Sequence, residues 1–210
     1  MKKIIITGGL GYLGTELCKI YSGESWQSKI VVIDNKFISE RVFQLNKWGI
    51  QFIQGDVLNK KFLQNIIPDA NIIHHLAGIT NVAYTKSESN IAQDQLIRST
   101  AIEGTLNILS LMNDEAKIIF PSTHVVFDGL SKPIVNLSEE EQPKPILAYS
   151  TSKYQNEIDI AKSGKKFVIL RLGSVYGYSG DATRINIMPN LFSKMAAQNQ
   201  SIKLFGGGRQ

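Results

Sequence analysis

The sequence predicts an α/β fold, a doubly wound parallel sheet of about seven strands flanked by helices. One observation behind this prediction is the apolar run at residues 4–6, in which isoleucines follow one another. Consecutive β-branched residues suit a strand that is buried on both faces of a parallel sheet, and hence a central strand. The other observation is that short apolar runs alternate with longer helical patterns, as they do when helices cover a parallel sheet.

A glycine-rich turn follows the first strand without a spacer. Gly8, Gly11 and Gly14 form the pattern G-x-x-G-x-x-G. Glycines at this spacing allow a tight turn, the close approach of a pyrophosphate to the backbone, and close packing of a helix on the strand. A helix is predicted next, because apolar residues follow at i, i+4 and i+7, namely Leu13, Leu17 and Ile20. The free N–H groups at its start favour an anion, so a phosphate is expected there.

An acidic residue ends the second apolar run. Asp34 follows residues 29–33 and lies 20 residues after Gly14. At this distance a dinucleotide-binding fold places the acid that bonds the ribose hydroxyls of adenosine. A carboxylate repels a 2′-phosphate, so Asp34 favours NAD over NADP, although Lys36 is a nearby cation that would soften the discrimination.

Further strands are predicted in order along the chain. They are residues 51–54, 71–75, 117–120, 167–171 and 202–205. The strand that begins at residue 117 is expected to stop at Pro121, because proline cannot donate to a central ladder. A long helix is predicted for residues 89–112, with Ile102, Leu106 and Leu109 on one face.

The strand ends indicate where a ligand would bind, because ligands of open α/β sheets lie beyond the carboxyl ends of the strands. The residues at these ends are small, polar or acidic. Besides the glycine turn they are Asp34, Asp56, Ala77, Gly78, Ser122, Thr123, Gly173 and Ser174. A purely structural edge has no need of this pattern, so this edge is predicted to hold the functional site.

Composition narrows the class of protein. The 210 residues are 43% hydrophobic and 20% charged, with a net charge of +5 and a pI near 9.2. Lysines and arginines are scattered, so no nucleic-acid partner is expected, and the mild positive charge suits phosphorylated substrates. The single cysteine, Cys18, excludes an intramolecular disulfide, and no run is long enough for a membrane span. A cytoplasmic protein without a membrane partner is the simplest expectation.

A tyrosine and a lysine form the candidate catalytic pair. Tyr149 and Lys153 are four residues apart in YSTSK, a spacing that places both side chains on one face of a helix. The lysine ammonium, together with a positively charged nicotinamide ring, would favour the phenolate, so that the tyrosine can act as a base around neutral pH. Thr123 is the candidate for the hydroxyl that orients the hydroxyl of the substrate.

These residues carry a family resemblance. The chain resembles the extended short-chain dehydrogenase/reductases, and among them the NAD-dependent epimerase/dehydratase type that acts on nucleotide sugars. The motifs are TGGLGYLG at residues 7–14, Asp34, GDV at 55–57, HLAG at 75–78, EGT at 103–105, PST at 121–123, YSTSK at 149–153, RLGSVYG at 171–177 and NIMPN at 186–190. In this order and spacing they are highly specific, and they span essentially the whole sequence.

The resemblance implies a Rossmann-type NAD-binding domain and a nucleotide-diphosphate sugar as the substrate. The catalytic residues that it implies are Thr123, Tyr149 and Lys153. The residues that it assigns to NAD binding are Gly8, Gly11, Tyr12, Leu13, Asp34, Asn35, Asp56, Val57, Leu76, Ala77, Gly78, Tyr149 and Lys153. Those that it assigns to the substrate are Thr123, His124, Ser174, Asn186 and Phe205.

A homodimer is also expected by resemblance, through the long helix at residues 89–112 and the helix of Tyr149. No metal site is predicted, because His74 and His75 have no carboxylate or cysteine partners at ligand spacing.

The sequence departs from the family pattern at three places. Ala101 stands where the family usually has Asn before the EGT-type glycine, and Ser174 stands where it usually has Asn before VYG. At the first position the family asparagine has a helix-kinking or water-binding role, which Ala101 would not supply. At the second position the family asparagine contacts the substrate, and Ser174 would change that contact. His124 and Val125 follow Thr123 where sugar 4,6-dehydratases carry an acid pair, which disfavours a 4,6-dehydratase.

Several functional hypotheses stay open at this point. The leading one is an epimerase-type oxidoreductase, in which NAD takes a hydride from a sugar carbon while Tyr149 takes the hydroxyl proton, giving a transient keto-sugar. An NAD(P)-dependent 4-keto-deoxysugar reductase is the alternative, because VVFDG at residues 125–129 resembles a segment of those enzymes. A non-catalytic NAD-binding sensor or a truncated pseudoenzyme belongs to another class, and the intact YSTSK argues against a sensor.

The expected domain division also follows from the resemblance. Residues 1–172 are expected to form the NAD-binding domain, and residues 173–210 the start of a substrate-binding region with the last strand of the sheet. Family members continue past the KLFGGGRQ-type segment, so the chain is interpreted as truncated. We expect it to bind NAD but to turn over substrate very weakly or not at all.

Overall fold

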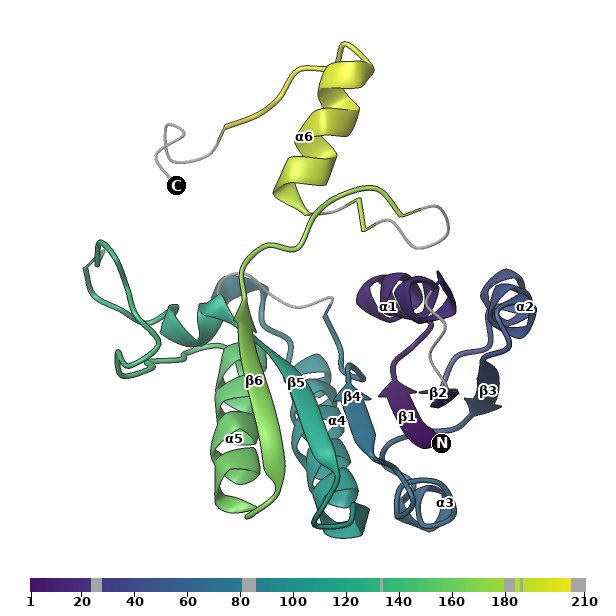
Figure 1. Ribbon diagram of the computed structural model, residues 1–210. Helices are drawn as coiled ribbons and strands as arrows, with labels where there is room; N and C mark the ends of the chain where they lie inside the picture. Colours follow the sequence, from purple (N-terminus) through teal and green to yellow (C-terminus); the bar gives the residue numbers. More distant parts are fainter. Residues whose placement is uncertain (24–27, 81–85, 133, 180–183, 186, 205–210) are drawn as a thin grey trace. The chain divides into compact units, whose positions relative to one another are not determined.

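The computed structural model describes residues 1–23, 28–80, 86–132, 134–179, 184–185 and 187–204 of the chain. It divides the chain into two compact units, Met1–Gly173 and Ser174–Gln210. The first unit contains a six-stranded parallel sheet with helices on both of its faces (Figure 1). The predicted fold class, a Rossmann-like α/β fold, is confirmed.

The first unit alternates strands and helices along the chain. Its strands are β1 (Lys2–Thr7), β2 (Ser28–Asp34), β3 (Gln51–Gln54), β4 (Ile72–His75), β5 (Lys117–Thr123) and β6 (Lys166–Leu172). Its helices are α1 (Tyr12–Gly23), α2 (Ser39–Lys47), α3 (Lys60–Leu63), α4 (Ile91–Leu111) and α5 (Ala148–Lys162), with short 3₁₀ turns η1 (Lys86–Glu88) and η2 (His124–Phe127). The strand order β3-β2-β1-β4-β5-β6 places β1 in the interior of the sheet, as predicted. Because all neighbouring strands are parallel, their carboxyl ends meet at one edge.

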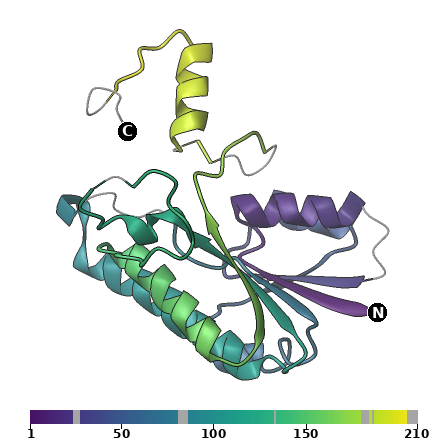
Figure 2. The ribbon, with the colours of Figure 1, turned by 60° about the vertical axis from the view of Figure 1, so that its left-hand side comes forward.

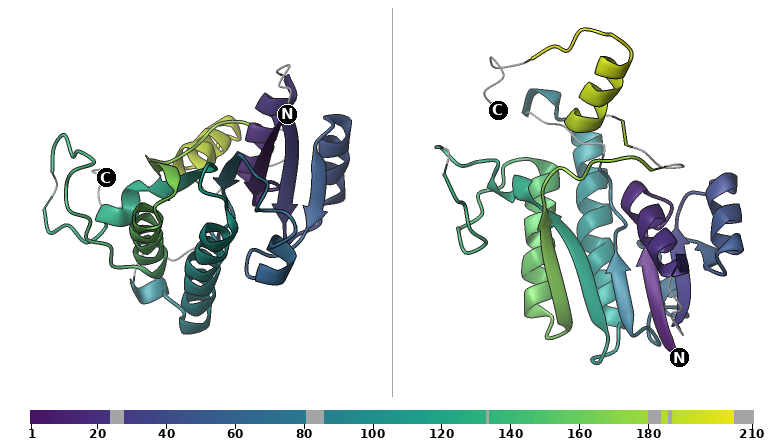
Figure 3. Two further views of the ribbon diagram at one scale, coloured as in Figure 1. Left: turned by 60° about the horizontal axis from the view of Figure 1, so that its bottom comes forward. Right: turned by 45° about the horizontal axis from the view of Figure 1, so that its top comes forward.

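The strand β1 is buried on both faces because its side chains alternate between two apolar clusters. Ile5 belongs to the same cluster as Ile108 of α4. Ile6 belongs to the opposite cluster, together with Cys18 of α1 and Leu45 of α2. Figures 2 and 3 show α1 and α2 on one side of the sheet and α4 and α5 on the other. The consecutive isoleucines of β1 therefore serve both layers.

Two details of the predicted strands are wrong. The strand β5 does not stop at Pro121 but continues to Thr123 in register with β6. Its pairing with β4 ends at Ile119, so the proline lies where β6 is the one sheet neighbour and a missing N–H is tolerated. Residues 202–204 form no strand, and Phe205 lies outside the described residues. An apolar run becomes a strand only where a neighbouring strand satisfies its backbone groups.

The buried faces of α1 and α4 differ from the predicted ones. Ile20 is 59% exposed and Leu106 is 46% exposed, although each belongs to the apolar spacing that predicts its helix. In α1 the small residues Gly14 and Thr15 are buried instead, because the start of the helix packs closely on the turn before it. In α4 the buried residues are Ile97, Gly104, Thr105, Ile108 and Leu109.

The second unit contains one helix among its described residues, α6 (Met188–Ala197). Asn190 ties the preceding loop to this helix, since its side chain accepts from the Gly177 N–H at 2.9 Å and donates to the Arg184 carbonyl at 2.9 Å. Over the part of the chain that the structure describes, none of the helices combines the length and the apolar character needed to cross a membrane.

Candidate functional site

The turn between β1 and α1 is built from glycine because its backbone passes very close to a neighbouring loop. Gly8 has a φ of +68°, and a Cβ there would lie 2.7 Å from the amide nitrogen of Ala77, just after β4. Gly11 donates across the turn to the carbonyl of Gly8 at 3.1 Å. The helix α1 then begins at Tyr12, so its free N–H groups lie at the carboxyl edge of the sheet. This arrangement can hold an anion such as a pyrophosphate.

Asp34 ends β2 beside this turn and is tied to it by backbone groups. Its Oδ2 accepts a hydrogen bond from the Leu10 N–H at 3.0 Å, and its Oδ1 accepts one from the Lys36 N–H at 3.0 Å. Sequence reasoning missed a second cation here: Arg41 of α2 donates to the carbonyl of Leu10. This cation could have been found from the sequence, because Arg41 is an arginine early in the helix that follows Asp34.

Asn35 and Asp56 lie together beyond the ends of β2 and β3. Asn35 Nδ2 donates to Asp56 Oδ2 at 3.1 Å, and Asp56 Oδ1 accepts from the Leu58 N–H at 2.9 Å. The next residue, Val57, is 5% exposed and packs on Gly104 of α4, where a Cβ would lie 2.8 Å from the valine Cγ2. Asp56 thus lies at the edge of the sheet, while the side chain of Val57 belongs to the core.

A buried histidine fixes the loop that follows β4. His75 Nδ1 is 2.8 Å from the hydroxyl of Thr7, and His75 Nε2 is 3.1 Å from the hydroxyl of Thr105 on α4. The Thr7 hydroxyl also accepts from the Ala77 N–H at 3.2 Å. Burial, and secondarily the charge of Lys153, lowers the pKa of His75 to about 3, so that the ring is neutral. The network holds the HLAG segment beside the glycine turn.

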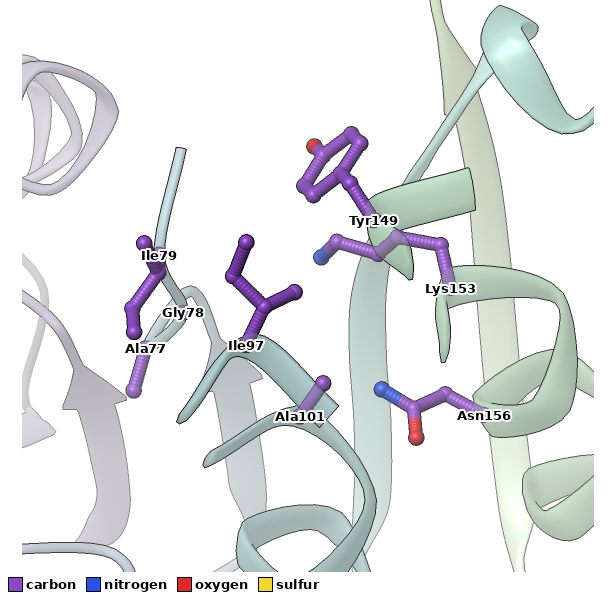
Figure 4. A pocket seen from close by; sticks show the side chains of 8 residues that line it. All are labelled: Ala77, Gly78, Ile79, Ile97, Ala101, Tyr149, Lys153 and Asn156. Carbon is purple, nitrogen blue, oxygen red and sulfur yellow. The ribbon is translucent and has the colours of Figure 1, made fainter. Parts of the chain in front are cut away.

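Tyr149 and Lys153 line one cavity from the same face of α5, as their spacing predicts (Figure 4). The other residues that line it are Ala77, Gly78 and Ile79 after β4, Ile97 and Ala101 of α4, and Asn156 of α5. The candidate catalytic pair is therefore close to the loop that contacts the glycine turn, although the two segments lie about a third of the chain apart in sequence.

The ammonium of Lys153 lies beside this cavity, and the residue is buried. Its Nζ donates to the Pro121 carbonyl at 2.8 Å, and it lies 4.3 Å from the ring centroid of Phe120 and 6.0 Å from that of Tyr149. Burial lowers the pKa of Lys153 to about 8, against the smaller opposing effect of the Glu157 carboxylate. At this pKa the lysine is mostly a cation at neutral pH and about half neutral near pH 8.

Thr123 ends β5 and caps the 3₁₀ turn η2. Its hydroxyl accepts from the Val125 N–H at 3.3 Å, and the residue is 6% exposed. His124 is exposed, with Nδ1 at 3.2 Å from the Leu172 carbonyl. Neither Thr123 nor His124 is among the described residues that line the cavity of Tyr149. The capping bond gives Thr123 a structural role, and a contact with substrate stays a prediction.

The segment VVFDG, residues 125–129, positions the start of α5. Asp128 Oδ1 accepts from the Ile146 N–H at 2.8 Å, and Asp128 Oδ2 accepts from the Ser150 hydroxyl at 2.7 Å. Ser150 follows Tyr149 directly in the first turn of the helix. The segment therefore has a structural role that does not depend on which reaction the site performs.

A buried carboxylate, which sequence reasoning missed, lies one helical turn after Lys153. Glu157 is 6% exposed and forms a bidentate pair with Arg171 of β6, in which the shortest nitrogen–oxygen distance is 2.7 Å. Its Oε1 also accepts from the Ser122 hydroxyl. Arg171 donates further to the Glu139 carbonyl at 2.8 Å, so the pair joins α5, β5, β6 and the loop before α5.

Replacing Glu157 with Leu is expected to lower the free energy of unfolding by about 3 kcal/mol, because it leaves the partly buried Arg171 without its carboxylate. Glu115→Leu is the matched control, since its pair with Lys166 is on the surface, with side chains 86% and 54% exposed, and should matter little. Urea titrations of both variants measure the difference. Equal losses for the two would contradict a structural role for the buried pair.

The remaining substrate candidates belong to the second unit. Ser174 is exposed. Asn186 and Phe205 lie outside the described residues. Within the described ranges, no three His, Cys, Asp or Glu side chains gather as metal ligands would.

The chain is similar to curated proteins along its whole length. The chain is 26% identical over 223 residues to a UDP-N-acetyl-alpha-D-glucosaminuronate decarboxylase of Bacillus cytotoxicus, covering 100% of this chain and 65% of that protein. It is 25% identical over 232 residues to a UDP-glucose 4-epimerase of Neisseria meningitidis serogroup C, covering 99% of this chain and 65% of the relative. The chain thus spans slightly less than two thirds of the length of these curated relatives.

A solved structure gives the same fold. The UDP-glucuronic acid 4-epimerase of Bacillus cereus, in complex with UDP-glucuronic acid and NAD, superposes with a TM-score of 0.76 at 25% identity, over 99% of this chain and 67% of that one. The model of the NAD dependent epimerase/dehydratase family matches residues 4–210. Because this match covers nearly the whole chain, the chain belongs to the NAD dependent epimerase/dehydratase family.

Proposed function

We propose that this chain supplies the NAD site and the proton-transfer residues of an enzyme that acts on nucleotide-diphosphate sugars through a transient keto-sugar. The observation that carries the proposal is the cavity that Tyr149 and Lys153 share with Ala77 and Gly78 (Figure 4). It brings a tyrosine and a buried ammonium next to the loop that contacts the glycine turn. Family membership and the names of the relatives support this class of substrate.

The residues at the carboxyl edge of the sheet fit a dinucleotide. The glycine turn has no space for a side chain at Gly8 and leads into the N-terminus of α1, where N–H groups and the helix dipole favour a pyrophosphate. Asp34 is proposed to accept hydrogen bonds from the adenosine ribose, and Asn35 and Asp56 to contact the adenine. NAD, when bound, supplies a hydride acceptor that can also return the hydride.

NAD is expected to bind at least tenfold more tightly than NADP, because a 2′-phosphate would meet the Asp34 carboxylate and a tenfold preference needs only about 1.4 kcal/mol. Asp34→Asn should reduce the preference, since it removes the charge while keeping an acceptor for the backbone of the turn. Asp69→Asn, beside Lys3 at the opposite edge of the sheet, is the control. Titration calorimetry with NAD and NADP measures both affinities. Equal affinities of the wild type for the two would mean that the charge of Arg41 or Lys36 offsets that of Asp34.

Tyr149 is proposed to be the general base. Its phenolate takes the proton of a substrate hydroxyl while the carbon that bears the hydroxyl loses a hydride, so that a carbonyl forms. The Lys153 ammonium, 6.0 Å from the ring centroid of Tyr149, stabilises the phenolate. When a hydride returns to the other face of the carbonyl carbon, Tyr149 gives the proton back to the oxygen, and the configuration is inverted.

Residues of both units are proposed to contact the substrate. Thr123 and His124 lie at the end of β5, on the carboxyl edge of the sheet, and are proposed to contact the sugar. Ser174, Asn186 and Phe205 are proposed to contact the rest of the substrate.

Product analysis with a panel of nucleotide sugars separates the epimerase from the reductase. An epimerase gives a stereoisomer of its substrate with no net change in NAD, whereas a reductase consumes one NADH or NADPH for each keto-sugar. We expect an epimer. The reductase alternative is based on the VVFDG segment, and the hydrogen bonds of Asp128 give that segment a structural role, so it does not favour the reductase. Stoichiometric loss of NADH with a 4-keto-deoxysugar would replace the epimerase by the reductase.

A homodimer through α4 and α5 is proposed as well. The helix α4 exposes the large apolar residues Ile91, Leu96 and Leu106, which is consistent with a covered outer face. Sedimentation equilibrium measures the oligomeric state directly. A monomer at all concentrations would contradict the dimer.

A further inference from the structure

The strand β5 presents an aromatic ring and a carbonyl oxygen to the ammonium of Lys153. The Nζ atom lies over the ring of Phe120, 4.3 Å from the ring centroid, and donates a hydrogen bond to the Pro121 carbonyl at 2.8 Å. The two groups belong to adjacent residues of β5, whereas Lys153 reaches them from α5. The place of the ammonium is therefore set by contacts with the sheet as well as by its own helix.

Both partners of the contact between ring and ammonium are buried. Phe120 is 1% exposed and belongs to the apolar cluster that contains Ile108 of α4 and Ile160 of α5, and Lys153 is 7% exposed. The face of an aromatic ring has a negative potential that attracts a cation, and the attraction is stronger where water is excluded. The ring therefore gives this ammonium a stabilisation that an aliphatic side chain of the core could not give.

The charged and titratable groups that face Lys153 come from α5, β4 and β6. The carboxylate of Glu157, one turn later in α5, stabilises the lysine charge, but it is paired with Arg171 of β6. His75 of β4 is neutral, because burial and the charge of Lys153 lower its pKa to about 3. The ring of Tyr149, which lies beside the lysine in Figure 4, has its centroid at 6.0 Å from Nζ. The residues of α4 in the cavity lining are apolar.

We propose that Phe120 is a positioning residue for the reaction, whose ring holds the ammonium of Lys153 in place and in its charged form beside Tyr149. The lysine in turn stabilises the phenolate that accepts the substrate proton. Burial already lowers the pKa of Lys153 to about 8, so loss of the attraction of the ring should leave much of the lysine neutral near neutral pH. The inference rests on the proposed function only in that it gives the charge of Lys153 a catalytic task.

The first test weakens the negative face of the ring and nearly keeps its shape. In the full chain labelled with ¹³Cε-lysine, 3,4,5-trifluorophenylalanine at position 120 is expected to shift the protonation equilibrium of Lys153 about tenfold toward the neutral form. A single fluorine at the same position should give a smaller shift in the same direction. Lys153→Met assigns the resonance. An unchanged titration with the trifluorinated ring would overturn the proposal.

Phe127 offers the matched control for the fluorinated ring. Its ring lies 5.3 Å from the guanidinium carbon of Arg171, so that it also faces a cation, but a different one. Trifluorophenylalanine at position 127 should leave the titration of Lys153 unchanged. Equal shifts from positions 120 and 127 would mean that the fluorines do not act through the contact of Phe120 with the ammonium, and the proposal would fail.

Phe120→Leu removes the aromatic face altogether. This variant should shift the protonation equilibrium of Lys153 at least as far as the trifluorinated ring does. It also leaves a cavity in the core and lowers stability, which urea denaturation measures. Because the fluorinated rings keep the volume of the side chain, their titration decides the question even where the leucine variant does not fold.

Turnover separates this inference from the proposed function. It is measured with a version of the protein extended to a full substrate-binding domain and a nucleotide sugar that its wild type converts. Trifluorophenylalanine at position 120 should leave kcat nearly unchanged at pH 6 and lower it about fivefold at pH 8, where it leaves about a tenth of Lys153 charged instead of half. KM should change little, since the substrate contacts are untouched.

Each outcome of the turnover measurement has a distinct meaning. If the extended wild type converts none of a panel of nucleotide sugars while the titration of Lys153 behaves as expected, the proposed function fails and the action of Phe120 on Lys153 stands. If the extended wild type is active and kcat of the trifluorinated variant equals that of the wild type at every pH, Phe120 does not position Lys153 for the reaction.

Discussion

Tyr149→Phe is expected to lower kcat for nucleotide-sugar conversion about 10³-fold, within the range that removal of a general base produces. Phenylalanine keeps the ring in the lining of the cavity but has no oxygen to accept the substrate proton. The affinity for NAD should stay within about twofold, because the ring carbons remain in place. Steady-state kinetics and calorimetry on the same preparations measure both quantities.

Tyr154→Phe is the matched control for this prediction. Tyr154 lies on the same helix, but its hydroxyl accepts from Gln142 at 3.1 Å and does not line the cavity. This variant should keep wild-type turnover. If Tyr149→Phe instead turned over as fast as Tyr154→Phe, Tyr149 would not be the base.

Acidification is expected to destabilise the fold strongly, because two buried histidines are neutral in the folded chain. Burial lowers the pKa of His74 to about 4, and burial with the charge of Lys153 lowers that of His75 to about 3, both from 6.5. Below pH 6.5 the unfolded chain binds protons at these rings and the folded chain does not, so stability falls as the pH falls. Well below pH 6.5 the two together cost about 2–3 kcal/mol per pH unit, until the folded values are reached.

Urea denaturation between pH 7.5 and pH 5 measures this slope in a window above the ordinary pKa values of carboxylates. His74→Gln should reduce the slope by about half, because it removes one buried ring while an amide can still meet the Tyr21 hydroxyl that lies 2.8 Å from His74. His124→Gln, at an exposed position, should leave the slope unchanged. A stability that does not vary over this window would contradict the neutral, buried state of the histidines.

The sequence predicts well what depends on short-range pattern. The run of isoleucines, the glycine turn and the strand at Gln51–Gln54 are recovered because local spacing and the absence of side chains determine them. The pairing of Tyr149 with Lys153 on one helix face follows from the helical repeat alone.

The parts that the sequence does not predict depend on which elements become neighbours. Pro121 is accommodated in β5 because the pairing of β5 with β4 ends before the proline. The sequence around Pro121 does not show where this pairing ends. Leu106 fits the apolar spacing of its helix and yet is exposed, since periodicity does not say which side faces the sheet. Glu157 reads as an ordinary polar helix position, and only its burial reveals the pair with Arg171.

The central claim is that Tyr149 and Lys153 perform proton transfer beside a bound NAD during hydride transfer from a sugar. It is tested most directly with a version of the protein extended to a full substrate-binding domain, by mixing its NAD complex with nucleotide sugars deuterated on the ring carbons and measuring deuterium in the nicotinamide by mass spectrometry after rapid quenching. We expect deuterium to enter the nicotinamide in the wild type and in Tyr154→Phe, and to enter about 10³-fold more slowly in Tyr149→Phe. Absence of deuterium in calorimetrically confirmed NAD complexes, across the whole panel, would contradict the enzyme and favour an NAD-binding sensor.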